Sequence, residues 1–170
     1  PYAAPELRCL DVNGAPVRLA DFRGTNVLLV FYLSDECVHC VEQLKAINER
    51  SEDWGRENTV VLGVSGVSPE KNKESSKLGE LSMRLLSDHD HENARRFASY
   101  DDFEELELHS TILIDARGRV HWKRTGGKPF ADVKFLLESV HRMNQKAAVT
   151  SDPVALKKAA DLDPKMIRPR

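Results

Sequence analysis

The sequence is poor in the features that mark several large classes of protein. Its 170 residues include only three cysteines, the close pair Cys37 and Cys40 and a separate Cys9, which excludes a disulfide-rich scaffold. No apolar run reaches the roughly 18 residues of a membrane-spanning helix, so we expect no membrane span. The formal net charge of −2 gives no reason to expect nucleic acid or an anionic membrane as a partner.

The chain also lacks internal repeats, low-complexity segments and a signal-like start. It begins with Pro1 rather than Met, which leaves the compartment open between the cytoplasm and export after processing. The length, with 41% apolar and 31% charged residues, fits one domain with its own core. We place a single domain at residues 1–144 and interpret 145–170, which hold three prolines, as a C-terminal extension outside the core.

Apolar runs of strand length alternate with helical patterns along the chain. We expect a hairpin that turns at Asn13-Gly14, and a helix within 68–81 that starts at Ser68 with Pro69 at its first helical position. The other expected elements are strands at 26–33, 59–67 and 83–88, helices at 38 to about 54, 90–100 and 131–144, and a hairpin at 110–126. This order predicts an α/β sheet of mixed direction.

The clearest chemical signal is Cys37-Val38-His39-Cys40, which follows a buried strand and opens a helix. Free N–H groups at a helix start stabilise a thiolate and can lower a thiol pKa from about 8.5 by one or more units. A protonated His39 would stabilise the Cys37 thiolate further, whereas Asp35 and Glu36 would raise its pKa. We expect the net effect to be a lowered pKa of the Cys37 thiol. Simple packing is the alternative, but redox folds place such pairs at this kind of junction.

Several segments resemble the redoxin branch of the thioredoxin-fold superfamily, which includes the peroxiredoxin (AhpC/TSA) and TlpA-like families. "APELRCLDVNGAPVRLADFRG" followed by "NVLLVFYLSDECVHC" is similar to the opening of these proteins, and "LLSDHDHENARRFASYDD" and "HSTILIDARGRV" are similar to later parts. The resemblance covers roughly residues 4–143. It implies a thioredoxin fold, with a central mixed sheet flanked by helices and a redoxin-type N-terminal β-hairpin.

The TlpA-like resemblance implies a thiol–disulfide oxidoreductase and thiol-dependent antioxidant, and this is the function that the sequence favours. Cys37 would attack a disulfide and Cys40 would resolve the mixed disulfide. His39 would tune the pKa of the Cys37 thiol. His109, at the position of the thioredoxin cis-proline, would face the cysteine pair. The expected substrate is a protein or small-molecule disulfide or hydroperoxide. The expected reducing partner of the cysteine pair is a thioredoxin-type system. We expect no cofactor.

The peroxiredoxin resemblance leaves a hydroperoxide reductase open as an alternative. Cys40 aligns with the peroxide-attacking cysteine of that family, Cys37 with a threonine that binds the peroxide, and His109 with an active-site arginine. A sulfenic acid on Cys40 would condense with Cys37. Because the two residues share one helical turn, we expect that turn to fray before the sulfurs can meet.

A third alternative is metal binding. "LHSTILID" resembles the segment that carries a ligand histidine in the Sco copper-chaperone family. Cys37, Cys40 and His109 would then form a soft site suited to copper(I) or zinc.

The remaining polar features have simpler interpretations. The two histidines of "SDHDHEN" belong to a loop that caps the following helix, with Asp88 or Asp90 as its N-cap. We expect Cys9 to be a buried and inert thiol. We expect the acidic segment 100–109 to be a solvated loop. If it borders the active site, it would disfavour anionic partners such as glutathione.

Overall fold

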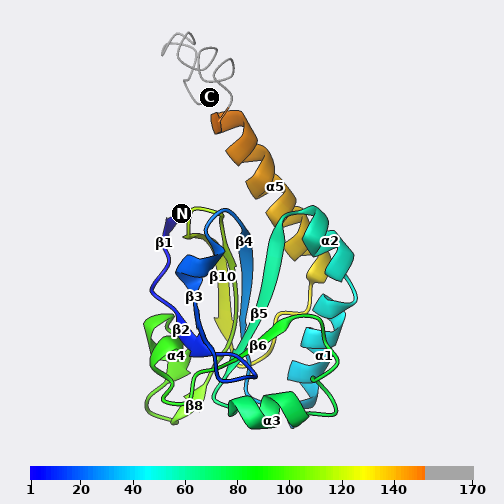
Figure 1. The fold of residues 1–170 in the computed structure, drawn as a ribbon. Coiled ribbons are helices and arrows are strands. Elements are labelled where there is room, and N and C mark those ends of the chain that lie inside the picture. Colours follow the sequence, from blue (N-terminus) through cyan, green and yellow to red (C-terminus); the bar gives the residue numbers. More distant parts are fainter. Residues whose placement is uncertain (152–170) are drawn as a thin grey trace.

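An eight-stranded sheet of mixed direction forms the centre of the computed structural model, which describes residues 1–151 (Figure 1). Its strands, in the order β1-β10-β9-β4-β5-β6-β2-β3, are β1 (Tyr2–Ala3), β10 (Arg119–Gly126), β9 (His109–Ile114), β4 (Asn26–Phe31), β5 (Thr59–Ser65), β6 (Arg84–Ser87), β2 (Arg8–Leu10) and β3 (Pro16–Arg18). Strands β4, β5 and β6 are parallel, whereas β9 is antiparallel to β4. The short strands β7 (Tyr100–Asp101) and β8 (Leu106–Glu107) pair separately.

Helices cover both faces of this sheet. They are α1 (Val38–Asn48), α2 (Ser51–Arg56), α3 (Pro69–Glu74), α4 (Glu92–Arg96) and α5 (Val133–Ser151), with a 3-10 turn, η1 (Leu19–Phe22). Side chains of β4 alternate between the faces. Leu28 and Val30 pack with α1, α2 and α5, whereas Phe31 packs on the other face with α4 and the N-terminal segment. Buried on both sides, β4 lies at the centre of the core, as its continuous apolar run predicts.

The predicted elements are present, but several differ in extent, and the helix expected at 90–100 spans only Glu92–Arg96. The hairpin at Asn13-Gly14 and the Ser68 cap of α3 are confirmed, but α3 is shorter than expected. The helix expected from 38 to about 54 is broken into α1 and α2. Helix α5 continues past the expected domain boundary at residue 144 and extends beyond the body (Figure 1). The rest of the expected extension, 152–170, lies outside the described residues.

The cap of α4 also differs from the prediction. His91 occupies the N-cap position, with φ of 58°, and makes no side-chain cap. The buried carboxylate of Asp88 instead accepts the N–H groups of Asn93 and Ala94. Asp90 accepts the N–H of Glu92. Both predicted acids therefore stabilise the helix start, although neither is the N-cap residue.

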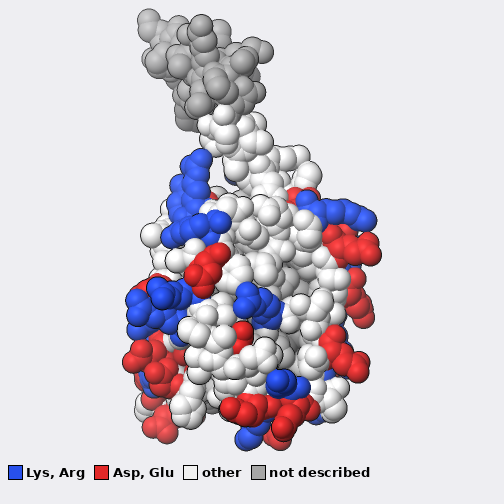
Figure 2. Space-filling view, viewed as in Figure 1, with Lys and Arg blue, Asp and Glu red and all other residues white. Residues whose placement is uncertain are grey.

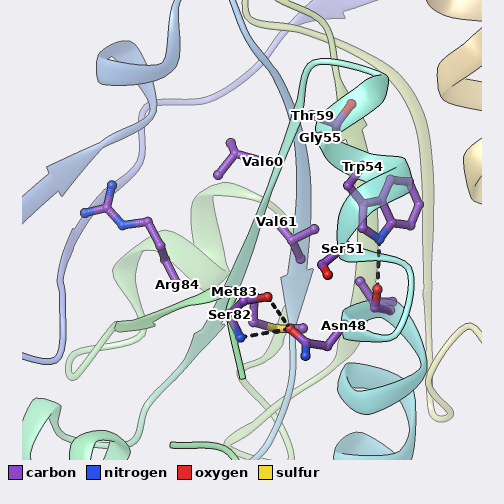
Figure 3. A pocket seen from close by; sticks show the side chains of 11 residues that line it. Asn48, Ser51, Trp54, Gly55, Thr59, Val60, Val61, Ser82, Met83 and Arg84 are labelled. Carbon is purple, nitrogen blue, oxygen red and sulfur yellow. Dashed lines mark hydrogen bonds between the residues drawn. The ribbon is translucent and has the colours of Figure 1, made fainter. Parts of the chain in front are cut away.

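The surface carries acidic and basic side chains of both signs, interspersed over the view in Figure 2. A cavity of about 180 Å³ lies between the α1–α2 segment and strands β5 and β6 (Figure 3). Trp54 lines it, and the Asn48 Oδ1 atom accepts hydrogen bonds there from the N–H and hydroxyl of Ser82. None of Cys37, Cys40 and His109 lines this cavity. Among the described helices, none is long and apolar enough to cross a membrane.

Candidate redox site

The fold brings Cys37, Cys40 and His109 together at one end of the sheet. Strand β4 ends at Phe31, and the following loop leads to Cys37 at the start of α1. Strand β9 begins at His109 and lies beside β4 in antiparallel register, with Phe31 opposite Ser110. The end of β4 and the start of β9 therefore lie at the same edge, which explains how a histidine so distant in sequence reaches the cysteines.

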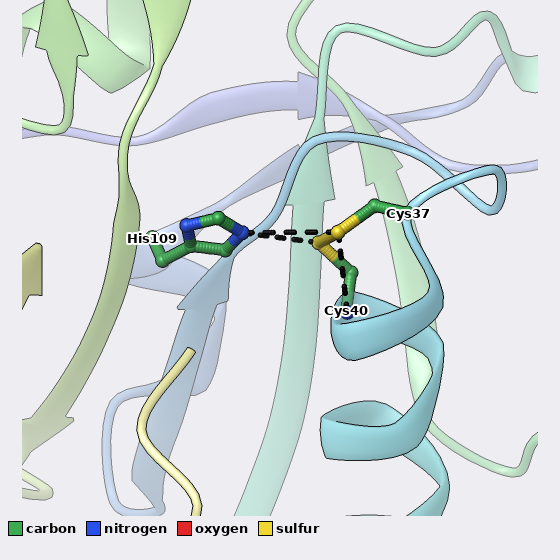
Figure 4. A group of neighbouring side chains, drawn as sticks. All are labelled: Cys37, Cys40 and His109. Atoms are coloured by element: carbon green, nitrogen blue, oxygen red, sulfur yellow. Dashed lines mark hydrogen bonds between the residues drawn. A yellow bond between two sulfur atoms is a disulfide. The ribbon is translucent and has the colours of Figure 1, made fainter. Parts of the chain in front are cut away.

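Cys37 and Cys40 form a disulfide across the start of α1 (Figure 4). Cys37 is the N-cap residue, with an extended backbone, and its sulfur accepts the Cys40 N–H at 3.3 Å. The two Cα atoms are 5.2 Å apart, within the usual range for a disulfide. The expectation that the first turn must fray is therefore wrong, because Cys37 precedes the first helical residue.

His109 faces both sulfurs, as the sequence comparison predicted. Its Nε2 atom lies 3.2 Å from the Cys40 sulfur and 3.9 Å from the Cys37 sulfur (Figure 4). Burial lowers the pKa of His109 below its ordinary 6.5, and nearby His39 lowers it further, whereas backbone hydrogen bonds at Gly126 and Gly127 act to raise it. The imidazole is therefore mostly neutral near pH 7 and can accept a thiol proton.

The two cysteines differ in exposure. Cys40 is 0% exposed and belongs to the core cluster that includes Leu44, whereas Cys37 is half-buried. Val38, between the cysteine pair, is exposed. In the disulfide form, solvent and other molecules therefore meet the pair at Cys37.

His39 lies on the exposed surface of α1. Its side chain is 79% exposed, and Nδ1 lies 3.4 Å from the Glu42 carboxylate. Within residues 1–151 it makes no hydrogen bond to either sulfur. Any influence of His39 on Cys37 therefore acts through charge, at a site open to solvent that screens it.

Gln43, which sequence reasoning missed, ties α1 to the strand that carries His109. Its buried amide donates hydrogen bonds to the Thr111 hydroxyl at 3.0 Å and to the Phe130 carbonyl at 3.1 Å. Gln43 follows Cys40 by three residues, so the signal was a polar residue on the buried face of the predicted helix. Its role is to fix the helix that carries the cysteines against the strand that carries the histidine.

Besides His39 and Glu42, a second histidine–carboxylate pair involves Glu107, two residues before His109. Glu107 is buried, and His91 Nδ1 lies 3.1 Å from its carboxylate. Burial raises the pKa of Glu107 from 4.5 to about 7. The His91 ring stacks on Tyr100 and lies so close to Gly66 that an added Cβ there would meet it at 2.5 Å. His91 is thus an anchor for the β7–β8 hairpin as well as part of the α4 cap.

The metal alternative has a geometric basis. Among the described residues, Cys37, Cys40 and His109 are the one set of three metal-ligating side chains whose ligand atoms lie close enough to share an ion, within 4.8 Å of one another. The histidines of "SDHDHEN" do not form such a set in this part of the chain.

Curated proteins with similar sequences include peroxiredoxins. The AhpC/TSA family model matches residues 2–123. Chloroplastic peroxiredoxin Q of Sedum lineare is 32% identical over 117 residues, which are 68% of this chain and 63% of the relative. Peroxiredoxin Bcp of Escherichia coli K12 is 29% identical over 127 residues, covering 69% of this chain and 79% of the relative. The chain thus spans less than two thirds of the plant relative's length.

Solved structures agree on the fold. AhpC of Enterococcus faecalis matches with a TM-score of 0.76 and 18% identity, over 88% of this chain and 94% of that one. Peroxidoxin BcpB of Mycobacterium tuberculosis matches with a TM-score of 0.73 and 16% identity, over 83% and 94%. The predicted thioredoxin fold is confirmed. With the family model covering most of the described chain, the protein belongs to the AhpC/TSA family.

Proposed function

We propose that the protein reduces hydroperoxides, with Cys40 as the attacking thiolate and Cys37 as the resolving thiol. The observation that carries this proposal is the 3.2 Å contact between His109 Nε2 and the Cys40 sulfur, beside a second sulfur that pairs with it without helix unwinding. The similarity to proteins named peroxiredoxins supports it. It places the sequence-based alternative ahead of the disulfide oxidoreductase that the sequence favoured.

The cycle starts from the reduced pair. His109 accepts the Cys40 thiol proton, and the thiolate attacks the terminal oxygen of the hydroperoxide. The O–O bond breaks, Cys40 becomes a sulfenic acid, and the departing alkoxide takes the proton from the His109 imidazolium and leaves as an alcohol. The imidazolium N–H thus occupies the role of the family arginine, as a donor toward the charge that develops on oxygen.

The resolving step closes the disulfide. The Cys37 thiolate attacks the Cys40 sulfur and expels hydroxide, which takes up the Cys37 proton and leaves as water. The two electrons that reduced the peroxide come from the cysteine pair. A dithiol donor then reduces the disulfide through a mixed disulfide. Because Cys40 is fully buried in the disulfide form, this donor attacks Cys37, the accessible sulfur.

Single-cysteine variants test the assignment. Reduced protein is mixed with hydrogen peroxide by stopped flow, and products are identified by mass spectrometry after addition of a sulfenic acid trap. We expect Cys40→Ser to lose fast peroxide reduction and Cys37→Ser to react once and accumulate trapped sulfenic acid. The opposite pattern would assign the attacking role to Cys37, and slow oxidation of the wild type would reject the proposal.

Disulfide exchange through Cys37 is a second candidate function, favoured by the exposure of Cys37 at the N-cap. A nucleophilic thiol at that position attacks an incoming disulfide directly. In this case Cys40→Ser traps a mixed disulfide with a model substrate at Cys37, while peroxide reacts slowly. His39 enters either function only by tuning the charge near Cys37.

Metal binding is a third candidate, supported by the convergence of two sulfurs and one imidazole. This donor set fits copper(I) or zinc when the cysteines are reduced. Anaerobic titration of the reduced protein, followed by metal analysis after gel filtration, tests it. Near-stoichiometric metal that is lost in His109→Ala supports binding, and metal-free wild-type protein rejects it.

A further inference from the structure

We infer that the redox site selects against negatively charged partners in both halves of its cycle. It takes neutral hydroperoxides in preference to anionic ones, and it is reduced by neutral or cationic thiols in preference to anionic thiols. The peroxide half of this inference rests on the proposed function. The thiol half needs only the Cys37–Cys40 disulfide.

The first observation is the absence of a cation in contact with the sulfurs. Their polar contacts within the described chain are with His109 Nε2 and the Cys40 N–H. His109 stands where the peroxiredoxin resemblance places an arginine, so a permanently charged guanidinium has been replaced by an imidazole. The site thus lacks the fixed positive charge that would hold a carboxylate or an anionic peroxide.

The second observation is the carboxylates on the approach to Cys37. Glu36 directly precedes Cys37, is exposed, and forms no ion pair with any described residue. Asp35 accepts a hydrogen bond from the Ser75 hydroxyl, and the Lys77 ammonium binds the Asp35 carbonyl at 3.0 Å. Lys77 offsets part of this charge, but Glu36 remains next to the accessible sulfur.

The segment that precedes His109 in the chain is acidic as well. Strand β8 ends two residues before His109; Asp101 closes β7, and the segment that connects β7 to β8 contains Asp102, Glu104 and Glu105. Asp102 pairs with Arg95, whereas Glu104 and Glu105 form no ion pair within residues 1–151. Phe103 at this tip is 91% exposed, so the hairpin is open to approaching molecules. In Figure 2, acidic side chains lie along the lower edge with basic ones among them, at the end where Figure 1 shows β8 and α3.

Basic side chains near the pair do not reverse this balance. Lys128 lines a cavity of about 350 Å³ beside α1, together with His39 and Glu42. The Glu42 carboxylate faces His39 across 3.4 Å, so this cavity contains charges of both signs. The discrimination therefore falls to Glu36 and the hairpin. Two partners that differ by one charge should differ in their reaction rates by roughly fivefold to tenfold at low ionic strength.

A thiol series of matched size tests the reductant half. The oxidised protein is reduced by cysteamine, 2-mercaptoethanol or 3-mercaptopropionate, which are cationic, neutral and anionic, at low and high salt. Rate constants are expressed per thiolate, and a small uncharged aromatic disulfide gives the intrinsic reactivities. We expect cysteamine to exceed mercaptopropionate by at least tenfold and this ratio to shrink toward that of the reference at high salt. Equal ratios for protein and reference would overturn the inference.

Charge substitutions locate the effect. Glu36→Lys should raise the rate with mercaptopropionate and lower the rate with cysteamine, by about threefold to tenfold each. The matched control is Glu52→Lys on α2, where the glutamate is also exposed but remote from the sulfurs. This control should leave both rates unchanged. An equal response to both substitutions would show a general effect of net charge and contradict selection at the site.

The peroxide half uses cumene hydroperoxide and its para-carboxylate, which differ by one negative charge. We expect the neutral compound to react at least fivefold faster at low salt, with the difference reduced in Glu36→Lys. A faster reaction with the carboxylate would overturn this half. If neither peroxide reacts quickly but the thiol series shows charge selection, the proposed peroxidase fails and the inference stands for the reductant alone.

Discussion

Cys9 and the Cys37–Cys40 pair lie in contrasting surroundings, one in a strand of the sheet and the other at the start of a helix. Cys9 lies within β2 and is 4% exposed; burial and the carboxylates of Asp88, Asp90 and Glu107 raise its pKa to about 12. The pair lies where a strand gives way to a helix, with an N–H group and an imidazole at the sulfurs.

This difference shows that burial alone does not decide thiol reactivity, since Cys40 is as buried as Cys9. Burial is the largest cause of the raised pKa of Cys9, and the charged groups near the sulfur add to it. Carboxylates around Cys9 disfavour the thiolate, whereas the amide and imidazole at the pair stabilise it. Four predictions test this contrast, from the largest expected effect to the smallest.

Alkylation should separate the two environments most strongly. In the reduced protein at pH 7.5, we expect iodoacetamide to modify Cys37 at least ~10³-fold faster than Cys9, because the thiol of Cys9 is both inaccessible and almost fully protonated. Peptide mapping at timed intervals measures both rates. In denaturant the two should react at similar rates, which is the control; fast labelling of native Cys9 would contradict the contrast.

Removal of the His109 imidazole should slow the reaction of the cysteine pair with peroxide. His109→Ala should slow peroxide reduction about 100-fold, because the Cys40 proton loses its acceptor. Since the pKa of His109 is lowered, the wild-type rate of peroxide reduction should not change with pH around pH 7. It should fall only below pH 6.5, as the imidazole becomes protonated. His109→Ala should lose this fall. Stopped-flow pH profiles measure it, with His121→Ala, at the other end of the sheet, as the control; an unchanged profile would exclude His109 as the base.

Glu107 should make stability depend on pH. Its pKa is raised in the folded state, so between pH 4.5 and about 7 the folded protein binds a proton that the unfolded chain releases. Stability should therefore fall on the order of 2 kcal/mol as pH rises through this window. Glu107→Gln should flatten this change in denaturant titrations at several pH values, and the exposed Glu138→Gln should leave it intact. A persistent fall in Glu107→Gln would assign the effect to another group.

Cys9 itself should contribute to packing alone. We expect Cys9→Ala to lower the free energy of unfolding by about 1 kcal/mol, the cost of a small cavity in the core, and to leave peroxide and thiol rates unchanged. Chemical denaturation and stopped-flow kinetics measure the two properties. A loss of activity in a stably folded Cys9→Ala would give this thiol a role in the cycle.

The strand and helix around the cysteines could be predicted because local pattern determines them. After Asn26, the residues of β4 up to Phe31 are all apolar, as a strand buried on both faces requires. His109 could not be found in that way, since pairing of β9 with β4 brings it to the sulfurs across about 70 residues of chain. Only the family resemblance pointed to it.

Two other features escaped prediction for physical reasons. Helical periodicity continues through Trp54, so the break between α1 and α2 left no apolar signal; Trp54 stays buried on the same side, and its indole N–H donates to the Ile47 carbonyl. The acidic segment before His109 read as fully solvated, yet Glu107 turns inward to His91. That inward orientation depends on a histidine contributed by a different segment, which composition does not reveal.

In the proposed cycle, the N-cap position of Cys37 removes one step before the disulfide can close. Rotation about side-chain bonds takes picoseconds to nanoseconds, whereas unwinding a helical segment takes about 0.1–1 μs. A sulfenic acid on Cys40 would therefore meet the Cys37 sulfur without any unwinding of α1. This arrangement would favour the disulfide over further oxidation to the irreversible sulfinic acid.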